Sequence, residues 1–466
     1  MNMAREYSAV SNLEVRGFFV SRVKIALTIF VILLLLIILV TLGVLLAHEK
    51  GKDKSGQTRD EARVGEEELS LTPMSCDVVV VGGGISGMYM AETLMRKKKE
   101  DDVCLFEKDS RFGGRNYDHR FSQAPNISIS LGAWRVDKNH KTVMDLVKRF
   151  NIPMFEMDGI RLAYVETRGF YASNLQSLKE QAFPSLLSGE FANMTSSEMS
   201  RSAWMNMTRE KALEFPSYQD FMCKRLGSEG CEYMRSSFAV KVDYNMEEST
   251  LFTYEHNQAN KYFSYDYLRP FGGLSEITTA LENSARRFGV KMYLNEKVEA
   301  LNRKGSSFAV QTEKFSVSAK KLIIAVPSFP FEKITGDVAT EIKSNYLFKS
   351  ILARPSFKAA AVYSYPWWEN ATSSQNITLK PFEIFVSGSN CLTAIMPYSG
   401  RGPHGEAVIQ LSYSLYGCSV KWGKFSKLPK EVFESELKKA VQEVFPGMVV
   451  PEPLDVVFKY WDNICW

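Results

Sequence analysis

The sequence predicts an α/β protein in which a Rossmann-type nucleotide-binding domain is interleaved with an α+β substrate domain and follows an N-terminal transmembrane helix. Three observations lead to this prediction: a glycine loop between an apolar strand and a helix, further apolar strands and amphipathic helices downstream, and an uncharged stretch at residues 25–47. The chain has 466 residues, of which 45% are hydrophobic and 24% charged. Such a chain can build two or three ordinary packed domains, so a wholly disordered or fibrous protein is excluded.

Charge and histidine content exclude two classes of partner. Lys and Arg total 57 against 53 Asp and Glu, a net charge of +4, and the dense basic run is confined to residues 97–99. Nucleic acid is not an expected partner, because binding to phosphate backbones needs a concentrated basic face. The five histidines are scattered and no Cys-x-x-Cys pair occurs, so no dedicated metal site is expected.

The uncharged stretch at residues 25–47 is long enough to span a bilayer core as a helix. A cleaved signal peptide would have a shorter apolar region, about 7–15 residues, followed by a small-x-small site, and we find no convincing Ala-x-Ala. We therefore expect an uncleaved anchor behind a cytoplasmic tail at residues 1–24. Residues 48–75 lack aromatic residues and are rich in charged residues, glycine and serine, which predicts a disordered stalk.

Glycosylation sequons favour one orientation of this anchor. Basic residues flank both of its ends, so the positive-inside rule does not decide. Five Asn-x-Ser/Thr sequons follow the anchor: Asn126, Asn193, Asn206, Asn370 and Asn376. They favour a type II single-pass glycoprotein with a lumenal or extracellular body.

The seven cysteines are compatible with that location. Two pairs could form disulfides, the first closing a short loop and the second bridging neighbouring strands: Cys223 with Cys231, and Cys391 with Cys418. Cys76 and Cys104 fall on expected core strands, where buried free thiols are the simpler interpretation.

The nucleotide site is predicted where an apolar strand at 77–81 meets Gly82-x-Gly84-x-x-Gly87. A helix follows to about residue 96, then a second apolar strand at 103–106 that ends in Glu107. Gly82 permits the tight turn, Gly84 lets a pyrophosphate approach the backbone, and Gly87 allows close helix–strand packing. The helix N-terminus offers N–H groups to the phosphates.

Three polar residues complete this prediction. Glu107 can accept hydrogen bonds from ribose hydroxyls and disfavours a 2′-phosphate. Ser86, in the first helical turn, and Lys108, beside Glu107, are further candidate cofactor contacts. The full strand–loop–helix–strand–acid order is far more specific for a dinucleotide than the glycine loop alone.

A second glycine pair in Arg111-Phe-Gly113-Gly114-Arg115 favours FAD over NAD, because an NAD dehydrogenase does not need it. It can carry the far side of the dinucleotide towards a flavin ring, with Arg115 available to a phosphate. These residues resemble the flavin-dependent amine oxidase family, which includes monoamine, polyamine and L-amino-acid oxidases. The resemblance covers about residues 76–461.

The resemblance implies further flavin contacts. Gly132, Ala133, Trp134 and Arg135 look like the family segment that runs along the flavin ring. The sequence 272–274 resembles the loop that re-enters the flavin domain before an amphipathic helix. Val298 matches the family valine whose backbone contacts adenine, and 321–327 is expected as another buried strand.

Lys358 resembles the family lysine that holds a water near flavin N5, with a matching distance to Pro366-Trp367-Trp368. Burying a lysine within an apolar strand is costly without a partner, so its position needs an explanation. Taken alone it could be a strand-edge lysine. The resemblance implies that it orients or activates water during flavin reoxidation or imine release.

Arg135 distinguishes substrate classes. Its segment resembles L-amino-acid oxidases, in which the matching arginine pairs with the substrate α-carboxylate, and a planar guanidinium suits a carboxylate. The alternatives are a structural ion pair or a flavin contact. Two departures from the family pattern weaken the match: 394–397 reads Ala-Ile-Met-Pro where such oxidases often have a tyrosine before the proline, and the chain ends five residues after Trp461.

These inferences assign residues 76–140 and 268–335 to a Rossmann-type FAD-binding domain, whose C-terminal part is expected to be missing, and residues 141–267 and 336–458 to the substrate domain. The expected function is an FAD-dependent oxidase of amino acids or amines that yields an imine or oxo product, ammonia and hydrogen peroxide. A polyamine or monoamine oxidase and a catalytically inactive, membrane-anchored binding protein are the alternatives. The expected partners are an amine or amino-acid substrate, oxygen and a membrane, and a homodimer is compatible with the sequence.

Overall fold

The computed structural model describes residues 71–157, 161–237, 248–259, 266–351, 353–369 and 377–465. The predicted tail at 1–24, the anchor at 25–47 and the stalk up to residue 70 lie outside the described residues. Within the described ranges, every helix is too short or too polar to cross a membrane.

The first sheet carries the glycine loop and has the strand order β10-β2-β1-β13-β12-β11. Its parallel part comprises β10 (Lys291–Tyr293), β2 (Val103–Phe106), β1 (Thr72–Val81) and β13 (Phe315–Ile324), and its antiparallel edge comprises β12 (Ser307–Thr312) and β11 (Val298–Lys304). Residues 78–81 and 103–106 are at most 3% exposed, as expected for strands covered on both faces. The predicted strand–loop–helix–strand order is therefore confirmed.

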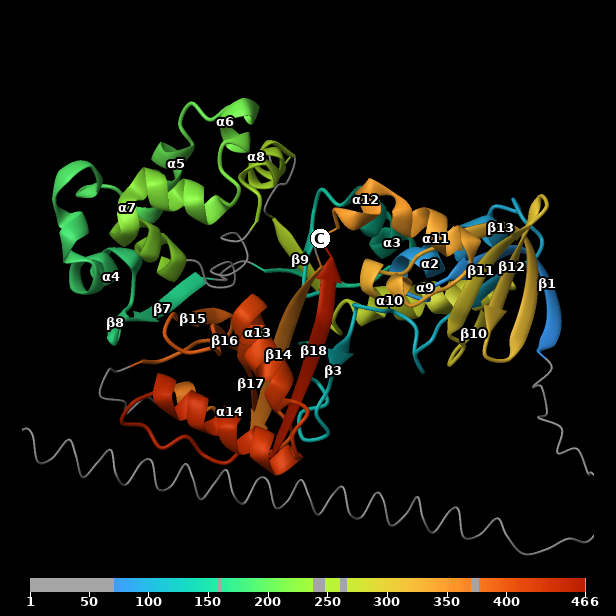
Figure 1. Cartoon of the computed structure of the whole chain (residues 1–466). Helices are drawn as coiled ribbons and strands as arrows, with labels where there is room; N and C mark the ends of the chain where they lie inside the picture. The colour runs from blue at the N-terminus through green and yellow to red at the C-terminus, as the bar shows by residue number, and fades with distance from the viewer. Residues whose placement is uncertain are drawn as a thin grey trace, which may run out of the picture. The chain divides into compact units, whose positions relative to one another are not determined.

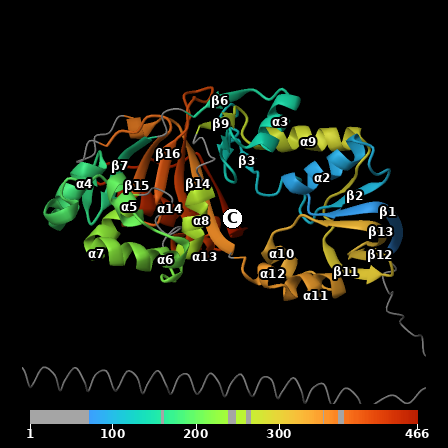
Figure 2. The same cartoon turned by 90° about the horizontal axis from the view of Figure 1, so that it is seen from above.

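Helices cover both faces of this sheet, as Figure 2 shows. α2 (Ile85–Arg96), α9 (Ser275–Arg287) and α3 (Lys141–Arg149) pack on one face through leucine, isoleucine and valine side chains. α10 (Ser328–Glu332), α11 (Asp337–Ser344) and α12 (Tyr346–Lys349) pack on the other. Thus 141–149 and 337–349, which the sequence assigned to the substrate domain, bury their apolar residues against the first sheet.

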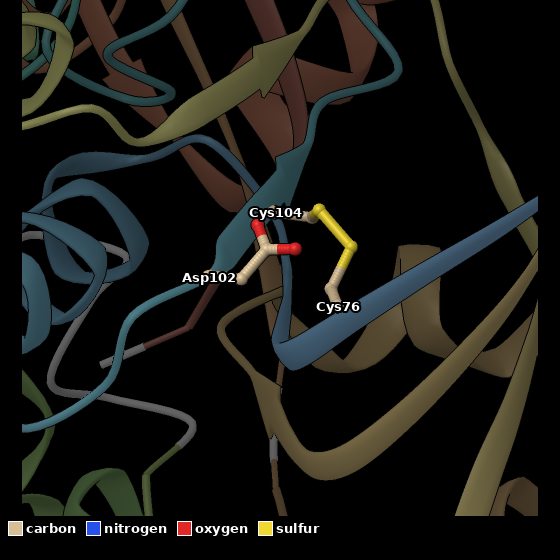
Figure 3. A group of neighbouring side chains, drawn as sticks. All are labelled: Cys76, Asp102 and Cys104. Atoms are coloured by element: carbon tan, nitrogen blue, oxygen red, sulfur yellow. A yellow bond between two sulfur atoms is a disulfide. The ribbon is translucent and has the colours of Figure 1, made fainter.

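The start of this sheet corrects two expectations. Residues 72–75, expected at the end of the stalk, belong to β1 and pair with residues 315–318 of β13. Cys76 and Cys104, expected as free thiols, form a disulfide with a Cα–Cα distance of 6.1 Å (Figure 3). They lie on the adjacent parallel strands β1 and β2, which brings the two side chains within bonding distance.

The second sheet has the strand order β18-β14-β17-β16-β15-β7-β8. It comprises β18 (Asp455–Cys465), β14 (Ala353–Tyr363), β17 (Ala407–Leu415), β16 (Ala394–Pro397), β15 (Glu383–Ser387), β7 (Arg161–Thr167) and β8 (Phe170–Ala172). α13 (Tyr416–Phe425) and α14 (Lys430–Val444) cover one face of β14, β17 and β18 (Figure 1). The amphipathic helices that the sequence indicates downstream of the glycine loop include α3 and α14.

Strand β14 alternates between two cores. Phe357, Ala359 and Ala361 pack in the cluster under α13 and α14. Ala360 and Val362 pack on the opposite face against a segment at residues 121–131. Because side chains alternate along a strand, Lys358 projects from this opposite face, towards the first sheet's loops.

A helical region packs on β7 and β15. It contains α4 (Leu175–Ala182), α5 (Ser196–Trp204), α6 (Arg209–Leu213), α7 (Tyr218–Ser237) and α8 (Thr250–Ala259), with short 3₁₀ turns at Pro184–Leu187 and Gly189–Phe191. Between the two sheets lie short strands: β3 (Asp118–His119), β4 (Ile129–Ser130), β5 (Val136–Asp137), β6 (Met154–Glu156) and β9 (Tyr267–Pro270). β3 pairs with β4, and β9 lies between β5 and β6.

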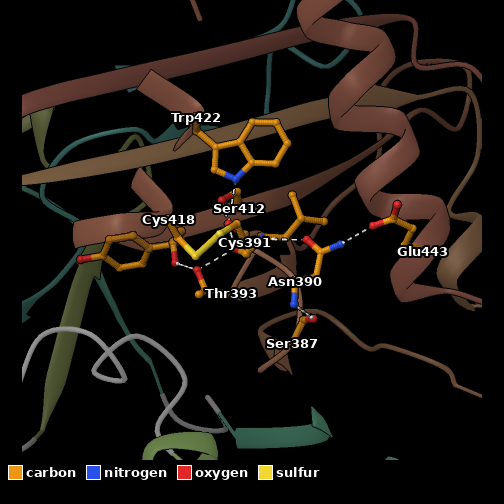
Figure 4. The surroundings of a disulfide bond; sticks show 10 residues. Ser387, Asn390, Cys391, Thr393, Ser412, Cys418, Trp422 and Glu443 are labelled. Carbon is orange, nitrogen blue, oxygen red and sulfur yellow. Dashed lines mark hydrogen bonds between the residues drawn. A yellow bond between two sulfur atoms is a disulfide. The ribbon is translucent and has the colours of Figure 1, made fainter. Parts of the chain in front are cut away.

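Both cysteine pairs suggested by the sequence are disulfides. Cys223 and Cys231 are joined within α7, across a break in helical geometry at Gly227. Cys391 is joined to Cys418, but it lies in the loop before β16 and Cys418 lies in α13, so the bond does not connect two neighbouring strands (Figure 4). Trp422 Nε1 of α13 also donates to Cys391 O at 2.7 Å, which fixes the same loop to the same helix.

Candidate functional site

A cavity of about 770 Å³ extends from the glycine loop to Lys358. It begins at the C-terminal ends of β1 and β2, where ligands of open α/β sheets bind. Its volume lies in the upper part of the range of about 300–1,000 Å³ that is typical of small-molecule sites. One cavity thus joins the predicted nucleotide residues to the predicted catalytic lysine.

The glycine loop has the geometry that its spacing predicts. Gly82 has a positive φ of 103°, and a Cβ added there would lie 2.6 Å from Ala325 O. A Cβ added at Gly87 would lie 1.9 Å from Gly82 O, so Gly87 packs behind the loop and does not line the cavity. A Cβ added at Gly84 would meet no protein atom, so the space beside this residue belongs to the cavity.

The start of α2 completes an anion site. Gly84 is the N-cap of this helix, and no side chain caps it. The first-turn N–H groups therefore face the loop side of the cavity, where Ser86 is exposed. Positive dipole and N–H donors together suit a pyrophosphate.

Glu107 lies at the end of β2 and is 8% exposed. Its carboxylate accepts hydrogen bonds from Gly83 N at 2.7 Å and from Asp109 N at 2.9 Å. Burial raises the pKa of this carboxyl group, and the two backbone N–H groups oppose that shift. Lys108 beside it is exposed and pairs with Asp109. The carboxylate is thus held in one orientation at the cavity wall.

The second glycine pair is held against the first. Gly113 N donates to Gly83 O at 2.9 Å, and Gly113 forms a β-bridge with Gly84. Arg111 fixes the turn from inside: its guanidinium donates to the carbonyl oxygens of Phe112, Gly114 and Asn116. Sequence reasoning gave Arg111 no role. A guanidinium that serves several carbonyls of one turn has no spacing signature.

Lys358 is 4% exposed and lines the cavity. Its Nζ donates to Gly132 O at 2.8 Å and to Ser130 O at 3.3 Å, and it lies 4.3 Å from the centre of the Tyr413 ring. Burial lowers the pKa of Lys358 to about 7; the charge of Asp118 opposes this shift, and those of Arg269 and Arg135 add to it. Near neutral pH this amine can therefore both hold and release a proton.

Three residues at this end were not predicted as site residues. Tyr413 lies opposite Lys358 on β17, and burial raises its pKa while the charge of Arg135 lowers it. Ser356 and Trp461 also line the cavity, and Trp461 Nε1 donates to Leu131 O at 2.8 Å. The pairing registers of β14 bring these residues together. The sequence shows the strands but not their registers.

Arg135 does not line the cavity, and it is exposed. Its guanidinium carbon lies 3.6 Å from the centre of the Tyr267 ring and 5.5 Å from that of Trp134. Its charge nevertheless acts on both Lys358 and Tyr413. Arg135 therefore lies near the lysine end of the cavity, stacked on an aromatic ring.

Most predicted site residues lie together. The cavity wall includes Gly82, Gly84, Ser86, Glu107, Lys108, Gly114, Arg115, Gly132, Ala133, Val298 and Lys358. Gly87, Trp134 and Arg135 lie outside that wall. Residues that follow β13 and residues in and next to α10, such as Val326, Phe329 and Lys333, line it as well, although the sequence indicated only a buried strand at 321–327.

These residues fit FAD. Backbone N–H groups at α2 suit the pyrophosphate, Glu107 suits ribose hydroxyls, and the wall at 131–133 leads to the lysine. The potential metal ligands Cys76, Asp102 and Cys104 do not fit a metal, because the two sulfurs are bonded to each other (Figure 3).

Comparison with known proteins agrees with this geometry. A family model described as flavin containing amine oxidoreductase matches residues 85–466. The chain is 39% identical over 79 residues to achacin of Lissachatina fulica (17% of this chain, 14% of achacin) and 31% identical over 75 residues to tryptophan 2-monooxygenase of Rhizobium rhizogenes (16% and 10%). The structure of cyclohexylamine oxidase from Brevibacterium oxydans aligns over 83% of this chain and 84% of its own, with a TM-score of 0.57 and 15% identity.

Proposed function

The chain belongs to the family of flavin containing amine oxidoreductases, and on this premise we propose that it is an FAD-dependent oxidase of amino acids or amines. The observation that carries the proposal is the single cavity that joins the glycine loop and Glu107 to the buried amine of Lys358. When bound, FAD supplies the electron acceptor for oxidation of a C–N bond and passes the electrons to oxygen, which yields hydrogen peroxide.

The chain's own residues support this chemistry in three ways. The loop at Gly82–Gly84 and the N-terminus of α2 bind the pyrophosphate, and Glu107 orients the adenosine ribose. The segment 131–133, held by backbone hydrogen bonds to Tyr117 O and Arg115 O, forms one wall of the cavity. Lys358 Nζ holds or releases a proton near pH 7 and can orient a water for imine hydrolysis or assist the return of electrons to oxygen.

We favour a substrate with a carboxylate. Arg135 is the observation behind this choice: it lies near the lysine end, and its face is supported by Tyr267 at 3.6 Å. A planar guanidinium can grip a carboxylate through two N–H groups. Among the relatives, tryptophan 2-monooxygenase acts on an amino acid and cyclohexylamine oxidase on a plain amine, so both classes belong in the test.

The test begins with the absorbance spectrum of the purified full chain, reconstituted with FAD. Hydrogen peroxide is then measured with a panel of L-amino acids, each paired with the amine that lacks its carboxylate. Peroxide from the amino acids supports the proposal, and peroxide from the amines alone makes the protein a monoamine or polyamine oxidase. A flavin-free protein, or a flavoprotein inert towards both panels, would contradict oxidase activity.

We also propose that the body matures in the secretory pathway as a type II membrane glycoprotein. Among the described residues, three disulfides join six cysteines, which is typical of an oxidising compartment. The sequon residues Asn193 and Asn206 are exposed. Asn126 is exposed as well, but its amide donates to Arg401 O at 2.8 Å and its sequon hydroxyl, Ser128, is buried.

Enzymatic removal of N-glycans tests this location. Protein from a eukaryotic secretory host should lose mass on treatment, and Asn193→Gln and Asn206→Gln should each remove one glycan. Asn126→Gln should leave the glycan mass unchanged. A full chain that carries no glycan and remains protected from an extracellular protease would contradict the proposed orientation.

A further inference from the structure

The part of the cavity wall next to Lys358, residues 131–133, is fixed by backbone hydrogen bonds. Leu131 N and Gly132 N both donate to Tyr117 O, and Ala133 N donates to Arg115 O. The carbonyls of Ser130 and Gly132 point the other way and accept from Lys358 Nζ. The position of the amine therefore depends on the position of these two carbonyls.

Behind Ser130, on the side away from Lys358, lies a buried polar network. The Ser130 hydroxyl donates to Asp118 Oδ1 and accepts from Arg269 Nη2 at 3.2 Å. The Ser130 N–H donates to the hydroxyl of Tyr398 at 3.3 Å. Every hydrogen-bonding atom of Ser130 is thus engaged, and its carbonyl is left facing Lys358.

The network is anchored to other elements. Asp118 Oδ2 accepts from Ser275 N at the start of α9, at 2.7 Å. Arg269 Nη2 also donates to Ser128 O at 2.7 Å and lies 4.0 Å from Asp118 Oδ1. The side chains of Asp118 and Arg269 are only 4% and 3% exposed, so their charges are weakly screened. An ion pair buried away from solvent adds little net stability, because removing both charges from water is costly. Its presence here therefore points to a role other than stability.

The charged and titratable groups around Lys358 come from four strands and from the segment before β5. Asp118 on β3 is the acid that favours the protonated amine, whereas Arg269 on β9 and Arg135 before β5 disfavour it. Tyr413 on β17 presents its ring face. Lys459 lies directly opposite Lys358 on β18, with its Nζ 5.0 Å from the Trp461 ring centre.

We propose that Asp118 and Arg269, linked through Ser130 and Tyr398, are positioning residues that set the place and the charge of Lys358 without touching substrate or flavin. The inference rests on the oxidase function proposed above, because it assigns these residues to the lysine of that site. Two effects are distinct. The carbonyl of Ser130 fixes where the Lys358 amine lies, and the charges of Asp118 and Arg269 set how readily that amine is protonated.

The test is the pH dependence of chemical labelling at Lys358 in the full chain. Trace acetylation with acetic anhydride is carried out between pH 5 and 10, and acetylation of the Lys358 peptide is quantified by mass spectrometry. Only the unprotonated amine reacts, so the midpoint reports its protonation, and we expect about 7 for the unchanged chain. Asp118→Asn should lower the midpoint and Arg269→Gln should raise it, each by about one unit, as for a neighbouring charge.

Opposite shifts from two changes in one network cannot come from general loosening of the fold. Glu166→Gln is the matched control, because this carboxylate is also 3% exposed and hydrogen-bonded, but to Ser387 and Ser389. It should leave the midpoint unchanged. If Asp118→Asn does not fold, Arg269→Gln and the charge-preserving Arg269→Lys still decide, since only the first should raise the midpoint.

Shifts in the same direction, or no shift in folded variants, would overturn the inference. Labelling needs no turnover and no bound flavin. If the protein fails the peroxide assay but shows the opposite midpoint shifts, the proposed oxidase function is refuted and the positioning network stands. If the protein is an active oxidase without those shifts, the oxidase function stands and the network is refuted.

Discussion

The glycine loop, Glu107 and the second glycine pair at the nucleotide end of the cavity all come from one stretch of chain, residues 82–115, whereas the lysine end joins residues as much as 330 positions apart, such as Leu131 and Trp461. The first end is formed by backbone N–H groups and a carboxylate. The second is formed by side chains on paired strands. A site built from local backbone is specified by spacing, and a site built across strands is specified by register.

The ends also differ in how they hold charge. Glu107 is fixed by two backbone N–H groups next to it in the chain or on the adjacent loop. Lys358 has two carbonyls, an aromatic ring and a distant acid. The loop glycines and Glu107 at the nucleotide end should therefore govern FAD affinity. Lys358 and its neighbours at the other end should govern the reaction rates and their pH dependence.

The largest effect that would sharpen this comparison is expected from Lys358→Met. Methionine keeps the bulk of the stem but removes the amine, so a proton-transfer role that contributes about 10²–10⁴-fold would be lost. Flavin reoxidation by oxygen should slow at least ~100-fold, with a much smaller effect on flavin reduction by substrate. Stopped-flow absorbance under aerobic and anaerobic conditions measures the two half-reactions separately.

Lys459→Met is the matched control, because Lys459 lies opposite Lys358 on β18 but does not line the cavity. Flavin reoxidation by oxygen in Lys459→Met should stay close to the rate of the wild-type protein. Equal slowing in both variants would mean that overall positive charge matters, and the lysine end would lose its assigned role.

Arg135→Ala comes next and tests whether the lysine end recognises a carboxylate. Arg135 is exposed, so the scale that applies is that of a hydrogen bond to a charged group, about 1.5–3 kcal/mol, and each 1.4 kcal/mol is about tenfold. The kcat/KM for an L-amino acid should therefore fall about tenfold or more. The matching amine without the carboxylate should be affected far less; equal losses on both would assign Arg135 to the fold or the flavin.

Glu107→Ala probes the other end. The substitution removes a charged acceptor, and hydrogen bonds to charged groups are worth about 1.5–3 kcal/mol, so FAD affinity should fall roughly 20-fold. Fluorescence titration of the apoprotein with FAD gives the dissociation constant. Glu299→Ala, at an exposed carboxylate outside the cavity wall, should leave it unchanged. An unaltered FAD affinity in Glu107→Ala would refute the ribose assignment.

The same contrast explains what could be predicted from the sequence. The sequence placed Gly82, Gly84 and Glu107 at the cavity because each has a fixed place in a short strand–loop–helix–strand unit, and it placed Gly114 there through the second glycine pair that follows this unit. Tyr413 could not be found, because it meets Lys358 only through the β14–β17 register, and both strands are nearly continuous apolar or small-residue runs. Lys358 itself was found through a family resemblance.

The missed disulfide has a related cause. Cys76 and Cys104 were correctly placed on core strands, but burial alone does not distinguish a thiol from a disulfide. The strand–helix–strand order implies that β1 and β2 are neighbours, and this adjacency was the available signal. The predicted stalk boundary was wrong because residues 72–75 pair with β13, and the partner of Thr72 in that strand, Phe315, lies 315 − 72 = 243 positions further along the chain.

The smallest expected effect is on protein stability, because burial of the Lys358 amine lowers the free energy of unfolding. This effect should change the folding equilibrium about tenfold per pH unit. Lys358 has a folded-state pKa of about 7, well below the ordinary value for lysine of 10.5. Between these values the unfolded chain binds a proton that the folded chain lacks, so the free energy of unfolding should rise with pH by about 1.4 kcal/mol per unit from this group. Below pH 7 the amine is protonated in both states, and this contribution no longer changes.

Lys358→Met removes the group, so the difference in unfolding free energy between the two proteins should change by that slope from pH 7 to 9. Urea unfolding at several pH values, with Lys459→Met as the control, measures the difference, and parallel curves would show that the buried amine keeps an ordinary pKa.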